Sequence, residues 1–87
     1  MEPITNEEDV KYYLGRLYFQ NKEYKKAIKV YKEGLKINPR AIILLYEIGL
    51  AYSKLKNHNK ALRYWKKLLK IAPYSSLADE VKWRLSK

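Results

Sequence analysis

The feature that most constrains this chain is an internal repeat with a period of 34 residues. Small residues and prolines recur at that interval, as Gly15 and Gly49, Ala27 and Ala61, and Pro39 and Pro73. An aromatic residue does the same, since Tyr18 returns as Tyr52. A fixed period of this length is typical of a stacked array, in which each unit buries its apolar face against its neighbour. The repeat therefore predicts an architecture before any single side chain is considered.

Each copy of the repeat predicts two helices joined by a short turn. Apolar residues recur at helical spacing, and a proline ends the second helix because the residue before it is pushed out of the α region. We expect helices over residues 7–20, 23–37, 41–55 and 59–71, followed by a last helix that Ser75 or Ser76 caps. Five antiparallel helices with short connections leave no room for a sheet. The sequence therefore predicts an all-α fold, an α-α superhelix of the solenoid type.

The same pattern divides the chain into parts. We expect an N-terminal arm over residues 1–6, repeat units over 7–40 and 41–73, and a capping helix over 74–87. Thr5 or Asn6 is expected to cap the first helix. Solenoids need a final helix that shields the last apolar face. The last segment also resembles the start of a further repeat, so a cut through a longer array would give the same sequence.

Each helix is expected to bury one apolar stripe. The stripe of the first helix consists of Val10, Leu14, Leu17 and Tyr18, and that of the last helix of Leu77, Ala78, Val81 and Leu85. Gly15 and Gly49 lie inside helices, where a glycine costs about 1 kcal/mol relative to alanine. Because this cost recurs at one phase of the repeat, we expect each glycine to lie where the second helix of its unit crosses the first.

Composition and local motifs exclude several function classes. The absence of Cys removes disulfides, thiolate chemistry and zinc-finger sites. His58 is the only histidine and no convergent carboxylate pair accompanies it, so no catalytic residue, metal ligand or cofactor site is predicted. No apolar run approaches the roughly 20 residues that span a bilayer, and the acidic start is unlike a signal peptide. We therefore expect a cytoplasmic protein, unless a signal or anchor precedes this sequence.

The spacing inside each copy is specific. The first copy reads Lys11-x2-Leu14-Gly15-x2-Tyr18…Ala27-x3-Tyr31…Pro39, and the second reads Leu45-x2-Ile48-Gly49-x2-Tyr52…Ala61-x3-Trp65…Pro73. Over residues 8–73 the pattern resembles the tetratricopeptide repeat, a helix–turn–helix unit of the form W-x2-L-G-x2-Y…A-x3-F…P. Only the opening Trp is missing from both copies. The structural signature of this resemblance consists of Gly15, Ala27, Pro39, Gly49, Ala61 and Pro73.

The resemblance implies a right-handed superhelix whose first helices line a concave groove for peptides or partner domains, without catalysis. The helical wheel indicates the same groove independently, because an aromatic-rich row lies away from the core stripes. The row consists of Tyr12, Arg16, Phe19, Ile43, Tyr46, Leu50 and Trp83. Aromatic residues and arginine are enriched at binding hot spots. An adaptor or scaffold that docks a protein or peptide on this row is the first functional hypothesis, although contacts with neighbouring helices would account for the same residues.

The second helices are predicted to carry a basic convex ridge at helical spacing. It consists of Lys25, Lys29, Lys32, Lys36, Arg63, Lys66 and Lys70. A solvated helix face is the favoured interpretation of such a ridge. A net charge of +10 nevertheless raises the prior for an anionic partner. Binding of nucleic acid or another anionic surface is therefore the second hypothesis, and a self-associating fragment of a larger repeat protein is the third.

Overall fold

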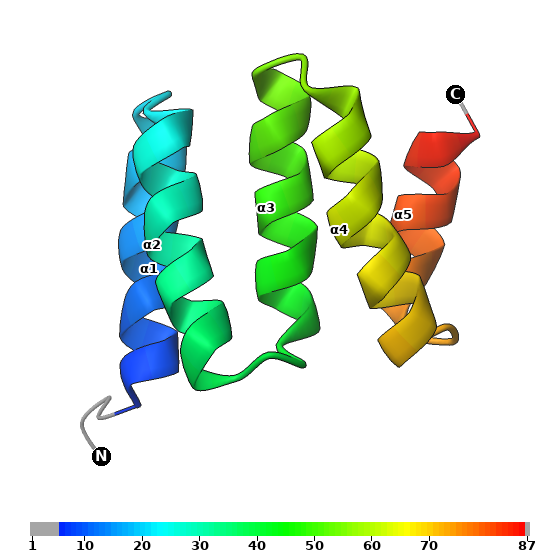
Figure 1. The fold of residues 1–87 in the computed structure, drawn as a ribbon, viewed down its shortest axis with the longest axis horizontal. Coiled ribbons are helices and arrows are strands. Elements are labelled where there is room, and N and C mark those ends of the chain that lie inside the picture. The colour runs from blue at the N-terminus through cyan, green and yellow to red at the C-terminus, as the bar shows by residue number, and fades with distance from the viewer. Residues whose placement is uncertain (1–5, 87) are drawn as a thin grey trace.

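The structure, a computed structural model, describes residues 6–86, which form five α-helices that alternate in direction along the chain (Figure 1). The helices are α1 (Glu7–Gln20), α2 (Tyr24–Ile37), α3 (Ile42–Lys54), α4 (His58–Ile71) and α5 (Ser76–Leu85). The predicted all-α fold is confirmed over these residues. Residues 1–5 of the expected arm, with the alternative cap Thr5, lie outside the described residues. None of the described helices has the length and apolar content needed to cross a membrane.

Side chains and prolines fix several helix ends. Oxygens of Asn6, Asn57 and Ser75 cap α1, α4 and α5 by accepting backbone N–H groups of the first turn. These bonds satisfy donors that have no partner inside the helix. Pro39 and Pro73 lie two residues beyond the ends of α2 and α4. The local sequence therefore sets the helix boundaries as expected.

The turn inside each hairpin has a backbone geometry that recurs with the repeat. Lys22 and Lys56 adopt left-handed conformations, with φ angles of 62° and 60°. In the first turn, the N–H of Glu23 donates to the Tyr18 carbonyl at 2.8 Å, and the second turn repeats this bond. Such a bond satisfies a carbonyl that would be left open at a helix C-terminus. The two hairpins therefore reverse the chain in the same way.

The core lies around α3, which packs against both α2 and α4 (Figure 1). Leu44, Ile48 and Ala51 of α3 are completely buried. The second helices contribute Ala27 and Ala61, which are 0% and 2% exposed. Small side chains at these two positions allow close approach between helices. The two alanines that recur with the repeat therefore allow the helices to pack closely.

Each repeated glycine lies under an aromatic ring of the second helix in its hairpin. A Cβ added to Gly15 would overlap the ring of Tyr31, and one added to Gly49 would overlap the indole of Trp65. The Trp65 Nε1–H group also donates to the backbone carbonyl of Tyr46 at 3.2 Å. The predicted crossing is therefore confirmed, and the residue that meets the glycine is the aromatic four positions after the alanine.

The predicted core stripe of α1 is wrong for three of its residues. Val10, Leu14 and Leu17 are 49%, 38% and 63% exposed. One repeat later, Leu44 and Ile48 occupy the same phase on α3 and are buried. The difference arises because α2 covers that face of α3, whereas no described helix covers the corresponding face of α1. The burial of this apolar stripe therefore depends on a neighbouring helix, and none of the described helices covers it.

The last helix buries only part of its expected stripe. Ala78 and Val81 are completely buried where α5 packs against α3 and α4, and Leu77 is partly buried. Leu85 is 43% exposed, so its predicted place in the core is wrong. It is the final residue of α5, where fewer neighbours cover the helix.

Gly49→Ala adds a methyl group that overpacks the contact with Trp65, at a cost of roughly 1–3 kcal/mol. Alanine is favoured over glycine in a helix interior by about 1 kcal/mol, so we expect a net destabilisation of up to about 2 kcal/mol. Thermal unfolding followed by circular dichroism measures the change. Lys54→Ala, at an exposed position of the same helix, is the control and should change stability by less than about 0.5 kcal/mol. A Gly49→Ala variant that melts at or above the wild-type temperature would contradict the crossing.

Candidate functional site

Tyr12 and Arg16, the first residues of the predicted row, interact on α1. Arg16 Nη1 donates to the Tyr12 hydroxyl at 3.4 Å, and the guanidinium lies 5.8 Å from the centre of the Tyr12 ring. This hydrogen bond raises the pKa of Arg16 above its ordinary value. Tyr12 is half-buried and Arg16 is exposed. The pair therefore places an exposed, positively charged guanidinium group against an aromatic ring.

Glu47 of α3 lies close to this pair and was missed by the sequence analysis. Burial raises the pKa of the Glu47 carboxyl, while Arg16 and the Tyr31 hydroxyl act in the opposite direction. The Tyr31 hydroxyl oxygen is buried without a hydrogen-bond partner of acceptable geometry among the described residues, and burial strongly raises its pKa. A lone acid in the apolar helix α3 was the signal that could have revealed this cluster.

Tyr46 does not lie on an open face, although the sequence placed it away from the core. It is 8% exposed. Arg84 of α5 donates from Nε to the Tyr46 hydroxyl at 3.1 Å, and its guanidinium lies 5.9 Å from the ring centre. The same guanidinium also forms an ion pair with Glu80, with 3.4 Å between Arg84 Nη2 and Glu80 Oε1. The docking of α5 is thus what covers Tyr46, so Tyr46→Ala would mainly report packing.

The other members of the row are dispersed. Ile43, Leu50 and Phe19 are half-buried, and the Phe19 ring packs edge-on against Tyr24 with ring centroids 5.1 Å apart. Trp83 is 54% exposed and lines a separate cleft of about 660 Å³ between α4 and α5. The row is therefore not one continuous aromatic surface, and its role in binding remains a prediction.

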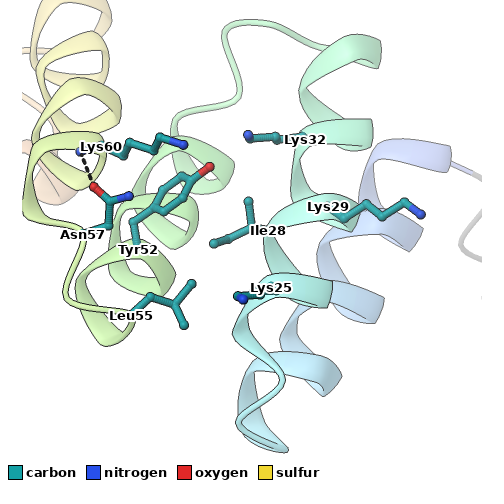
Figure 2. A pocket seen from close by; sticks show the side chains of 8 residues that line it. All are labelled: Lys25, Ile28, Lys29, Lys32, Tyr52, Leu55, Asn57 and Lys60. Atoms are coloured by element: carbon teal, nitrogen blue, oxygen red, sulfur yellow. Dashed lines mark hydrogen bonds between the residues drawn. The ribbon is translucent and has the colours of Figure 1, made fainter.

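All seven residues of the predicted basic ridge are exposed. Three of them, Lys25, Lys29 and Lys32, also line a cleft of about 730 Å³ between the hairpins. Figure 2 shows Lys32 of α2 and Lys60 of α4 extending from opposite sides toward Tyr52. The sequence analysis missed Lys60 and Tyr52, because Tyr52 was recognised only as a repeat position. The prediction that the whole ridge is convex is therefore wrong for Lys25, Lys29 and Lys32, which line a concave site.

Comparisons with known proteins match the repeat itself. A family model described as TPR repeat matches residues 15–56, and one described as Tetratricopeptide repeat matches residues 42–75. The second match begins at the first residue of α3 and extends past the end of α4. No curated protein matches the chain significantly.

Glu47→Gln is expected to raise the melting temperature at pH 7, because burial disfavours the ionised carboxylate. The folded-state pKa of Glu47 lies above its ordinary value of 4.5, so the native state binds this proton more tightly than the unfolded state. The stability from this group is therefore present below pH 4.5 and is lost as the pH rises through the folded-state pKa. Thermal melts across the acidic to neutral range should show the advantage of the variant growing with pH.

Glu33→Gln provides a control of opposite sign. The hydrogen bond from Lys11 lowers the pKa of the exposed Glu33 carboxyl, so this group contributes its stability at neutral pH and loses it in acid. A Glu47→Gln variant that melts below wild type at pH 7 would mean that attraction to Arg16 outweighs the cost of burial.

Proposed function

Because the chain belongs to the tetratricopeptide repeat family, whose repeats generally mediate protein–protein interactions, we propose that it binds a peptide or partner surface on the face formed by its first helices. The proposed face includes Tyr12 and Arg16 of α1 together with Ile43 and Leu50 of α3. Such repeats are typically non-catalytic interaction modules, and the proposal assigns no reaction to the chain.

The contact between Arg16 and Tyr12 is the observation that supports this proposal most directly. Arginine on an aromatic ring is a combination enriched at binding hot spots. The 3.4 Å bond to Tyr12 restrains the guanidinium, which lowers the entropy lost on binding. An arginine has five N–H donors, so further donors remain for a partner's carbonyl or carboxylate oxygens. The face thus combines an exposed cation with half-buried apolar residues.

Arg16→Glu is expected to raise the Kd for a captured peptide by about 30-fold or more, equivalent to ~2 kcal/mol. Peptides would first be selected from a displayed library against the wild-type protein, and affinities then measured by fluorescence anisotropy. Lys66→Glu makes the same charge change on an exposed position of α4 and should leave the Kd within a few-fold of wild type. Equal losses in the two variants would mean that overall charge, and not this face, captures the peptides.

Self-association is a second candidate function, supported by the exposed stripe of α1. Val10, Leu14 and Leu17 lie on one face at helical spacing, and Tyr13 beside them is 52% exposed. A soluble monomer seldom leaves several large apolar side chains exposed together. Two copies could pair through this face in an isologous contact, in which each stripe covers the other.

Leu17→Glu tests the second candidate. The wild-type mass measured by light scattering is expected to rise with concentration from the monomer value of 10.4 kDa toward a dimer, whereas the variant remains monomeric. Tyr74→Glu is the matched control, because Tyr74 is 95% exposed and lies outside the stripe. A wild-type protein that remains monomeric at every accessible concentration would exclude pairing through α1.

A further inference from the structure

The cleft between the two hairpins combines cationic walls with an apolar floor (Figure 2). Its walls carry lysines from α2 and α4, and its floor includes Ile28, Tyr52 and Leu55. Ile28 and Tyr52 are 6% and 8% exposed, whereas Leu55 at the edge of the cleft is 37% exposed. The volume of about 730 Å³ lies within the range of small-molecule sites.

Two lysines converge on one ring in this cleft. The Nζ atoms of Lys32 and Lys60 each lie 5.5 Å from the centre of the Tyr52 ring. They come from different helices, α2 and α4, and Figure 2 shows both reaching into the space beside the Tyr52 hydroxyl. The hydroxyl raises the pKa of Lys32, which therefore remains charged at neutral pH. A single anionic group seated beside Tyr52 would contact both ammonium groups.

No carboxylate balances the charge of this cleft. None of its lining residues is acidic. Within residues 6–86, the lysine ion pairs are those of Lys11 with Glu33 and Lys26 with Glu23, both outside the cleft. Lys32 and Lys60 are both exposed, so their ammonium groups are accessible to a ligand from solvent. An anion bound between the two lysines would be attracted by both charges.

The start of α4 adds to the positive field. Lys60 lies in the first turn of α4, which contains no acid. A helix N-terminus carries a partial positive charge that favours anions and disfavours lysine. Asn57, the residue that caps α4, lines the cleft directly. The sequence thus places a lysine where a helix alone would favour an acidic residue.

We propose that this cleft binds a phosphate-bearing ligand, with the phosphate between Lys32 and Lys60 and an apolar or planar portion against Tyr52 and Leu55. Lysine is a compact point charge that suits the several oxygens of a phosphate group. The apolar floor provides a surface for the remainder of the ligand. The site uses α2, α4 and the end of α3, so it does not depend on the face of the first helices proposed above to bind a protein partner.

Titration with inorganic tripolyphosphate tests the charge chemistry directly, and vesicles containing a phosphoinositide test a lipid headgroup as the source of the phosphate. Calorimetry measures affinity, and NMR shifts of the backbone amides from Asn57 to Lys60 locate the site. The double variant Lys32→Gln/Lys60→Gln removes both converging charges. Lys36→Gln/Lys66→Gln is the matched control, because it removes two exposed charges from the same two helices outside the cleft.

We expect saturable binding of tripolyphosphate or of the phosphoinositide vesicles, weakened at least tenfold in the cleft variant and less than about threefold in the control. The probe that binds more tightly identifies the source of the phosphate. Equal weakening in both variants would overturn the proposal in favour of diffuse attraction to a basic surface, as would binding only to long nucleic acid. An acidic peptide of equal charge that binds as tightly as tripolyphosphate would overturn the assignment to phosphate.

Discussion

The contact between an aromatic ring and a helix backbone determines the geometry of both hairpins. Tyr31 lies over Gly15 and Trp65 lies over Gly49, at positions where any Cβ would overlap the ring. Glycine has a conformational cost in a helix, but here the missing side chain lets a large ring reach the neighbouring backbone. The second hairpin adds a buried hydrogen bond from the Trp65 indole, which the Tyr31 hydroxyl of the first hairpin does not match. The same crossing is therefore reinforced by an indole hydrogen bond in the second unit, whereas in the first unit the Tyr31 hydroxyl lies close to the Glu47 carboxyl.

The stacking of the two hairpins makes α3 the central helix and gives the two ends of the molecule different properties. The face of α3 that contains Leu44 and Ile48 is covered by α2, while the equivalent face of α1 remains exposed. At the other end, α5 covers Tyr46 through Arg84 and buries Val81. A similar apolar pattern thus yields a buried core in one unit and an exposed stripe in the other, because each unit of a repeat protein is covered only by its nearest neighbours.

The stacking of the hairpins also places the charged side chains in two distinct environments. On the first helices, Arg16 of α1 lies against the Tyr12 ring, and Glu47 of α3 lies nearby. On the second helices, Lys32 and Lys60 both approach the Tyr52 ring, and no acidic residue lines the cleft. The first arrangement suits hydrogen bonds to a peptide, and the second suits a multivalent anion. A net charge of +10 by itself describes neither.

The sequence by itself determined the five helices, the family and the glycine crossings, because each depends on spacing within one hairpin. Helical periodicity, proline stops and the repeated glycines are local signals, and the hairpin turn brings them together over a short stretch of chain. Only the tertiary structure decided that the Leu17 side of α1 is exposed, that Arg84 covers Tyr46 from 38 residues away, and that lysines of two helices share one ring. These features depend on how one hairpin lies against the next, and a helical wheel, which treats each helix alone, contains no information about that neighbour.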